Sequence, residues 1–421
     1  MRINFANASF KDFENIPGLD IQQRAELFSD FLGFMTDHHH MNYRLLNLSG
    51  CGPQMQVITP VSTLPQKYVS FVSNDYLGFT QHPLVKNAVV EAVQRLGTGA
   101  GASPLIGGHF YFHQQLEEKI AAFFGRGKDS SIIYTTGYTA NSASLQSLLQ
   151  KEDIAIVDTA VHASVYEGCQ LTTRKSFLHN DMESLERILR DVRTKYRTKM
   201  VIVDGVYSQD GDVAPLDEIY RLTKHYGGFL MVDDAHGIGV LGRTGRGAME
   251  TFDLLDKVDF ITGTFSKTFA NIGGYVIGNP KIISFLKFQS RQHIFSATAT
   301  PASAGIVKAI ELIDEEPFWQ QQLADNIAYF KNGLSTLGMD VGNTESAIIP
   351  VKIGDPHKTS DVGTMLLKAG IYTNPILYPA VAKKNARIRM SLMATHTKQQ
   401  LDKTLNAFED VNKVLHFSKT A

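Results

Sequence analysis

Two residues in the middle of the chain, Lys267 and Asp233, are of types that support covalent and electrostatic catalysis. Lys267 lies in GTFSKTF (263–269), just after an apolar segment, and Asp233 lies at the end of the preceding apolar segment, FLMVDD. A partly buried lysine can lose its proton and form a Schiff base with an aldehyde. A carboxylate at the end of a buried strand needs a cation or a hydrogen-bond donor, and a protonated pyridine nitrogen is one such cation.

Other residues that could take part in binding or catalysis follow neighbouring apolar segments. The turn TTGYTAN (135–141) leads from one segment into a helix, and a helix N-terminus of this kind can bind phosphate. His162 and His236 place imidazoles at two further segment ends. Each feature taken alone has an ordinary structural explanation. Lys267 could be a solvated lysine, Asp233 could cap a turn, and the turn at 135–141 could be a simple helix cap. In combination, a phosphate turn, an imidazole platform, an acid for a ring nitrogen and a lysine for an aldehyde match pyridoxal phosphate (PLP).

The apolar segments that carry these residues predict an α/β domain. Their near-continuous apolarity is typical of strands in a parallel sheet covered on both faces, and helical periodicity fills the intervals. Because ligands bind beyond the carboxyl ends of such strands, the polar residues above are expected at one edge of the sheet. The predicted strands are residues 131–136, 154–158, 200–205, 229–234, 258–264 and 274–278.

The pattern changes along the chain in a way that predicts three parts. Residues 71–300 form the large α/β domain, and residues 301–421 form a smaller α+β domain in which helical patterns dominate. Residues 1–70 are expected to pack on the small domain or on a dimer partner.

Composition excludes several classes of protein. The 421 residues carry 41 basic and 42 acidic side chains, so there is no electrostatic case for binding nucleic acid or an anionic membrane. Only two cysteines, Cys51 and Cys169, are present, which favours a reducing cytoplasm over a secreted disulfide framework. No signal peptide or membrane span is predicted, although contact with a membrane surface stays open.

Motifs across residues 71–410 resemble those of the α-oxoamine synthases, a branch of the fold-type-I PLP enzymes. The resemblance implies a large domain with a mainly parallel, seven-stranded sheet and a smaller α+β C-terminal domain. The matching motifs are SNDYLG (73–78), GTGAGAS (97–103), TTGYTAN (135–141), DGVYSQDGD (204–212), VDDAHGIGVLGRTGRG (232–247), GTFSKTF (263–269), FSATATPAS (295–303) and RIRMSLMATHT (387–397).

Catalytic roles carried over by this resemblance fall on four residues. Lys267 is expected to hold PLP and to take and return the Cα proton of the substrate. Asp233 is expected to pair with the pyridine nitrogen, and His236 to hydrogen-bond the ring 3-oxygen. His162 is expected to stack on the ring face.

The resemblance also implies the surrounding binding residues. Ser208 is expected near the ring, while Gly137, Tyr138, Thr264 and Ser266 are expected around the phosphate. Ser296 or Thr298 is expected to reach the phosphate of a neighbouring subunit, because the family builds its sites across a homodimer. Asn74 is expected near the substrate, and Arg389, rather than Arg387, is expected to bind the carboxylate of the amino acid.

The implied reaction joins an amino acid to an acyl thioester with loss of carbon dioxide, but the substrates differ between branches. The sequence motifs are most like those of serine palmitoyltransferases, which favours serine and a long acyl chain. Pro104 and Tyr378 depart from the family pattern near the substrate, so cysteate comes next, followed by glycine or alanine with shorter acyl groups. The acyl donor, coenzyme A or acyl carrier protein, is left open.

Two other readings of the chain are less favoured. GTGAGA (97–102) superficially resembles a dinucleotide-binding loop, yet it follows a helical pattern instead of a strand. A regulatory homologue without catalysis is disfavoured because Lys267, Asp233, His236 and His162 are all present.

Overall fold

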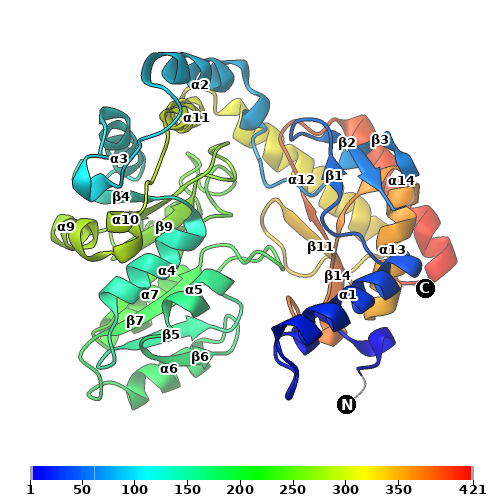
Figure 1. The fold of residues 1–421 in the computed structure, drawn as a ribbon, viewed down its shortest axis with the longest axis horizontal. Coiled ribbons are helices and arrows are strands. Elements are labelled where there is room, and N and C mark those ends of the chain that lie inside the picture. Colours follow the sequence, from blue (N-terminus) through cyan, green and yellow to red (C-terminus); the bar gives the residue numbers. More distant parts are fainter. Residues whose placement is uncertain (1–2, 61, 419–421) are drawn as a thin grey trace. The chain divides into compact units, whose positions relative to one another are not determined.

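The computed structural model describes residues 3–60 and 62–418, which divide into two compact units (Figure 1). The first unit comprises the described residues of Met1–Ser73, Gln209–Gly211 and Asp325–Ala421. The second unit comprises Asn74–Ser208 and Asp212–Ala324.

The second unit is built on a seven-stranded sheet with the order β4-β10-β9-β8-β7-β5-β6. Neighbouring strands from β9 to β6 run parallel, whereas β10 pairs antiparallel with both β4 and β9. The prediction of a mainly parallel, seven-stranded sheet is therefore confirmed. The strands are β4 (Ser131–Tyr134), β5 (Ile154–Asp158), β6 (Thr173–Phe177), β7 (Lys199–Asp204), β8 (Phe229–Asp233), β9 (Phe260–Thr264) and β10 (Gly274–Ile277).

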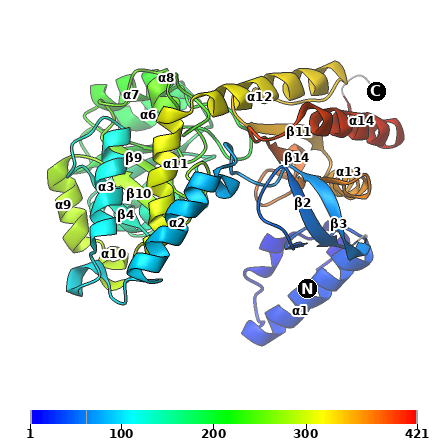
Figure 2. The same ribbon diagram turned by 90° about the horizontal axis from the view of Figure 1, so that it is seen from above.

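Helices of the second unit cover this sheet. Helix α4 packs against β4, β9 and β10, and α2 lies alongside α11 (Figure 2). The helices are α2 (Pro83–Leu96), α3 (Tyr111–Phe123), α4 (Gly137–Leu148), α5 (Ala163–Gly168), α6 (Met182–Asp191), α7 (Leu216–His225), α8 (Ala248–Thr251), α9 (Pro280–Gln289), α10 (Arg291–Phe295) and α11 (Ala304–Glu315).

All six strands predicted for this sheet are present, with ends shifted by at most two residues. The seventh strand, β6, was not predicted. It lies at the edge of the sheet, and the side chains of Arg174, Lys175 and Ser176 are exposed, so its sequence TRKSF has no apolar run. The antiparallel direction of β10 also could not be read from apolarity alone, because burial on both faces looks the same in either direction.

The first unit contains two smaller sheets. In the sheet β1-β2-β3-β12, β12 pairs parallel with β3, so segments from the two ends of the chain share one sheet. The other sheet, β11-β14-β13, is antiparallel. The strands are β1 (Leu46–Asn47), β2 (Gln54–Thr59), β3 (Ser62–Ser70), β11 (Ile348–Gly354), β12 (Ile371–Tyr372), β13 (Asn374–Ile376) and β14 (Ala386–Ser391).

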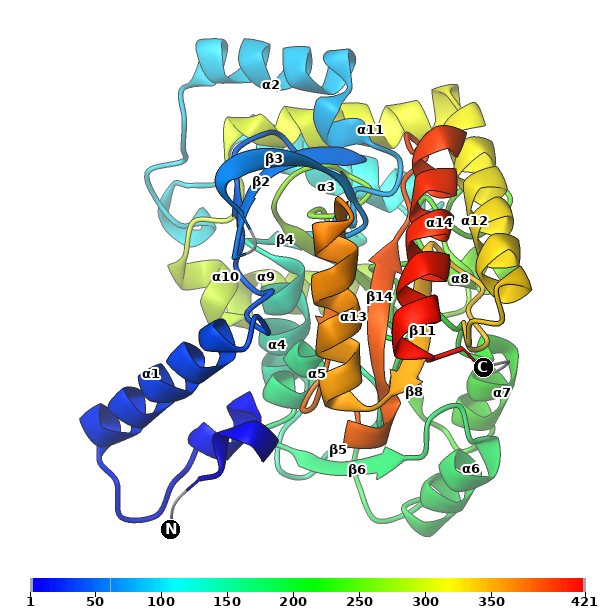
Figure 3. The same cartoon turned by 90° about the vertical axis from the view of Figure 1, so that its right-hand side faces the viewer.

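Helix α13 packs against both β14 and α14 in the first unit (Figure 3). The boundary between the units falls within α12, after Ala324. The division at residues 70 and 300 drawn from the sequence stays a prediction. The remaining helices are α1 (Ile21–Asp37), α12 (Phe318–Thr336), α13 (Pro356–Lys368) and α14 (Lys398–Leu415), with short 3-10 helices η1 (Phe5–Asn7), η2 (Phe10–Phe13), η3 (Phe79–Gln81), η4 (Pro104–Ile106), η5 (Pro301–Ser303) and η6 (Lys383–Asn385).

None of the helices in the described part of the chain has the length and apolar character needed to cross a lipid bilayer.

Candidate active site

A cavity of about 230 Å³ lies in the second unit, where polar residues follow the carboxyl ends of five strands. It brings together nine of the residues that the sequence predicted for the site. Those residues are Gly137, Tyr138, His162, Ser208, Asp233, His236, Thr264, Ser266 and Lys267. The lining is completed by Thr136, Asn141, Asp204, Val206, Ala235 and Gly263.

Lys267 and His236 are in direct contact in this cavity. The Lys267 Nζ lies 2.7 Å from His236 Nε2, and the hydroxyl of Tyr76 lies 2.6 Å from His236 Nδ1. Both ring nitrogens therefore have neighbours that fix the orientation of the buried imidazole. Tyr76 lies within the SNDYLG motif, but its contact with a residue 160 positions away was not predicted.

Asp233 is only 7% exposed and is held by two donors. The Asn141 side-chain amide donates to Oδ2 at 2.6 Å, and the Ala235 backbone N–H donates to Oδ1 at 3.1 Å. Asp204 pairs with Asp233 on the neighbouring strand, and its pKa is raised well above the ordinary range by burial and by the charge of Asp233. Of these two adjacent acids, Asp204 is thus the one expected to be neutral.

His162 lies four residues beyond the end of β5 and also faces the cavity. Burial lowers its pKa, so the imidazole is expected to be neutral near pH 7. Its Nδ1 lies 2.8 Å from the Ser164 hydroxyl, and its ring meets the Tyr138 ring edge-on at 5.8 Å between centroids. A neutral ring held by these contacts offers a flat face for an aromatic ligand.

The N-terminus of α4 lines the cavity and has the donors that an anion requires. Thr136 caps the helix by accepting from the Thr139 N–H at 3.0 Å, and the first-turn amides of a helix carry partial positive charge. Thr264 and Ser266, with their hydroxyl oxygens 2.6 Å apart, lie next to this turn. Gly137 is required here, because a Cβ atom at that position would lie 2.6 Å from the Cβ of Thr264.

Four predicted site residues do not line this cavity. Asn74 is linked to His236 of the cavity through Tyr76, whose hydroxyl donates to Asn74 Oδ1 at 3.4 Å. Ser296 and Thr298 follow α10, and their predicted reach into a neighbouring subunit stays a prediction. Arg389 lies on β14 in the first unit, where its Nη1 donates to the Ser391 hydroxyl at 3.0 Å.

Arg387 and Arg389 have different surroundings on β14. Arg387 is 2% exposed and forms an ion pair with Asp210 at 2.5 Å, so it already has an anionic partner within the first unit. The choice of Arg389 as the carboxylate ligand stays a prediction.

His179 is a partly buried histidine between two carboxylates, and its pairing was not predicted from the sequence. Its two ring nitrogens lie 3.0 Å from Asp158 Oδ1 and 2.8 Å from Asp212 Oδ2. Burial opposes a charge on this ring, but the hydrogen bonds to the two carboxylates outweigh it and raise the His179 pKa to about 10. A protonated His179 therefore ties the segment after β6 to the end of β5 and to the segment after β7.

This raised pKa predicts a pH-dependent stability. The ordinary pKa is 6.5, so the stabilisation is complete below about pH 6.5 and is lost as the pH rises to about 10. We expect the melting temperature of His179→Gln to fall less between pH 7 and pH 10 than that of the wild type. Replacement of the exposed His225 by Gln serves as the control, and identical pH profiles for all three proteins would contradict the assignment.

The cavity fits PLP in each of its chemical parts. A lysine amine faces the same space as a buried, doubly hydrogen-bonded carboxylate, and a glycine-lined helix N-terminus lies beside two hydroxyls. Together with a mainly parallel, seven-stranded sheet, these features define a fold-type-I PLP-dependent enzyme.

Comparison with known proteins gives the family. The family model "Aminotransferase class I and II" matches residues 66–408, and the chain belongs to this family, within its α-oxoamine synthase branch. The chain is 40% identical over 354 residues to 8-amino-7-oxononanoate synthase of Thermoanaerobacter pseudethanolicus, covering 83% of this chain and 89% of the relative. It is 37% identical over 357 residues to serine palmitoyltransferase of Bacteriovorax stolpii, covering 84% of each chain.

Solved structures resemble the whole fold. Serine palmitoyltransferase of Sphingomonas wittichii matches with a TM-score of 0.89 and 28% identity, over 95% of this chain and 100% of that chain. Another matching serine palmitoyltransferase structure contains PLP. The chain is accordingly a PLP-dependent acyltransferase.

Proposed function

We propose that this enzyme condenses serine with a long-chain acyl thioester. In this reaction the amino acid Cα forms a bond to the acyl carbon, the thiol leaves, carbon dioxide is released and a 2-amino ketone remains. The observation that carries the choice of serine palmitoyltransferase chemistry is the structural match at a TM-score of 0.89 over 95% of this chain, against 0.71 over 83% for a solved 8-amino-7-oxononanoate synthase. Cysteate in place of serine is the nearest variant of the same proposal.

Alanine with a pimeloyl thioester is the second candidate pair. It is favoured by the sequence comparison, because several relatives with about 40% identity are 8-amino-7-oxononanoate synthases. Glycine with a short acyl group has no comparable support.

PLP, when bound, supplies an electron sink for the negative charge that develops at the amino acid Cα. Lys267 carries the cofactor and moves the proton at Cα. Asp233 keeps the ring nitrogen protonated by presenting the negative charge that Asn141 and the Ala235 amide orient. His236 aligns the Lys267 amine, which lies 2.7 Å from its Nε2, and would lie at the ring 3-oxygen of bound PLP.

Binding roles follow from the same arrangement. The α4 N-terminus, Thr264 and Ser266 would hold the phosphate, and His162 would cover the ring face. Arg389 binds the substrate carboxylate, since a guanidinium offers two parallel donors to a planar anion. We further propose a homodimer in which Ser296 or Thr298 of one subunit contacts the phosphate of the other.

The substrate proposal is tested by initial rates over a matrix of substrates. Serine, cysteate, alanine and glycine are each combined with palmitoyl-, pimeloyl- and acetyl-coenzyme A, and release of thiol and of carbon dioxide is measured. We expect serine with palmitoyl-coenzyme A to give the highest kcat/KM, by at least about tenfold, because discrimination in substrate pockets usually exceeds this ratio. The highest kcat/KM for alanine with pimeloyl-coenzyme A would instead assign the second candidate.

A further inference from the structure

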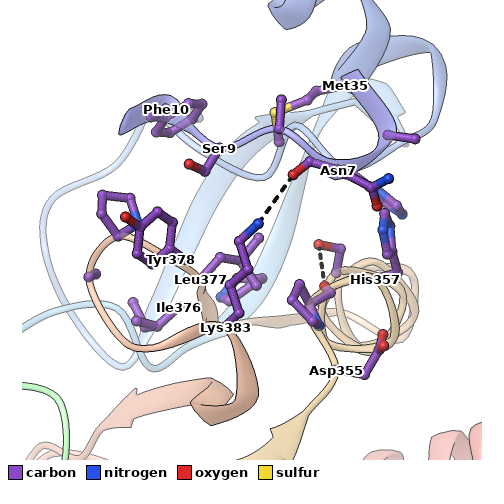
Figure 4. Close-up of a pocket in the computed structure, with 18 of the residues that line it drawn as sticks. Asn7, Ser9, Phe10, Met35, Asp355, His357, Ile376, Leu377, Tyr378 and Lys383 are labelled. Carbon is purple, nitrogen blue, oxygen red and sulfur yellow. Dashed lines mark hydrogen bonds between the residues drawn. The ribbon is translucent and has the colours of Figure 1, made fainter. Parts of the chain in front are cut away.

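A cavity of about 1010 Å³ lies in the first unit, and all of its lining residues belong to that unit. The N-terminal segment 5–10 and helix α1 form one side, while the loop 375–384 and the start of α13 form the other (Figure 4). Its volume is at the upper end of the range that small-molecule sites occupy. None of its residues lines the Lys267 cavity.

The wall of this cavity is mainly apolar and is braced by ring contacts. Phe10, Met35 and Leu377 lie around the space (Figure 4). The Phe10 ring meets the rings of Tyr43 and Phe31 edge-on at 5.6 and 6.1 Å between centroids. Such a wall offers dispersion contacts and removes a hydrocarbon chain from water.

Lysines outnumber carboxylates among the residues that line the cavity. Asp355 is already used as the cap of α13, because its Oδ1 accepts from the Lys358 N–H at 2.7 Å. Lys383 and Lys384 are exposed, and the Lys383 Nζ donates to the Asn7 backbone carbonyl at 3.5 Å and lies 5.8 Å from the centroid of the Tyr378 ring (Figure 4). Lys11 lies at the same distance from that ring, so cations cluster around Tyr378.

We propose that this cavity binds a single long hydrocarbon chain that ends in an anionic group, as in a long-chain carboxylate. The chain lies against Phe10, Met35 and Leu377, and the anionic group meets Lys383 and Lys384. An apolar wall alone would accept any hydrocarbon, whereas the lysines select a negative head group. The proposal does not rest on the proposed substrates of the Lys267 cavity.

Calorimetric titration of the PLP-loaded enzyme with monomeric palmitate tests this site. We expect one palmitate to bind per chain, and the double variant K383E/K384E to bind at least about tenfold more weakly, because charge-assisted hydrogen bonds are replaced by repulsion. The matched control K175E/K195E makes the same change of charge at exposed lysines of the second unit and should bind palmitate as the wild type does.

Two further experiments test the apolar wall and the selectivity for a negative head group separately. Leu377→Asp places a carboxylate in the apolar wall and should abolish binding, with circular dichroism confirming that the variant is folded. Hexadecylamine, which has the same chain length and a cationic head, should bind the wild type at least about tenfold more weakly than palmitate. Absence of palmitate binding, or equal binding by wild type and K383E/K384E, would overturn the proposal, whatever substrates the enzyme turns over.

Discussion

Replacement of Lys267 by alanine is expected to give a folded protein whose turnover falls by on the order of 10⁴-fold or more, because in the proposed reaction this side chain supplies both the covalent link and the proton transfer. The fold should survive, since Lys267 lies at the cavity, after the end of β9, and is not part of the hydrophobic core. The measurement is kcat with saturating amino acid and acyl thioester, alongside the melting temperature of the same preparation.

Lys257→Ala is the matched control, because Lys257 is an exposed lysine of the same unit. Its kcat should equal that of the wild type. Wild-type turnover by Lys267→Ala would remove Lys267 from the mechanism. A loss of turnover accompanied by unfolding would be resolved with Lys267→Arg, which keeps a positive charge at the position but cannot link covalently to PLP.

Replacement of Asp233 by asparagine is expected to lower kcat by about 10²–10³-fold, the range typical of removing one oriented electrostatic group from an active site. Asparagine keeps the shape of the side chain but lacks the negative charge that, in the proposed reaction, maintains a proton on the ring nitrogen. The Asn141 amide, which donates to Asp233 Oδ2 at 2.6 Å, would lose its charged acceptor as well. The loss should appear in kcat more than in the KM for the amino acid.

Asp234 provides a close control for this substitution. It is the next residue and fully buried, but burial raises its pKa to about 7, and it lies against Gly237 and the start of α8 rather than in the cavity. Asp234→Asn at pH 6.5 should therefore cost far less activity than Asp233→Asn. Equal losses from the two variants would show that a general disturbance of this turn, and not the charge of Asp233, explains the effect.

The residues of the site were predictable because they follow apolar segments in the local sequence. Lys267, Asp233, His236 and His162 each lie within a few residues of a buried strand end, and parallel strands bring those ends to one edge. The contacts between these residues were not predictable in the same way. Tyr76 and His236 are 160 positions apart, so only the folded chain shows that the hydroxyl orients the imidazole.

The fold was least predictable where burial is one-sided. In β2, Met55, Val57 and Thr59 are buried while Gln54 and Gln56 are exposed, so the strand alternates and lacks the apolar run of the central strands. Strand β3 pairs with β12 across about 300 residues of sequence, a long-range contact for which local pattern carries no signal. The structure thus adds most in the first unit, where the sequence assigned residues 1–70 no secondary structure.

The central claim is that Lys267 carries PLP covalently, and it is tested most directly by chemical trapping. The purified enzyme is reduced with borohydride, digested and mapped by mass spectrometry. The account predicts a phosphopyridoxyl group on the peptide that contains Lys267, and its absence from the Lys267→Ala protein. A phosphopyridoxyl group on a different lysine, with Lys267 unmodified, would contradict it.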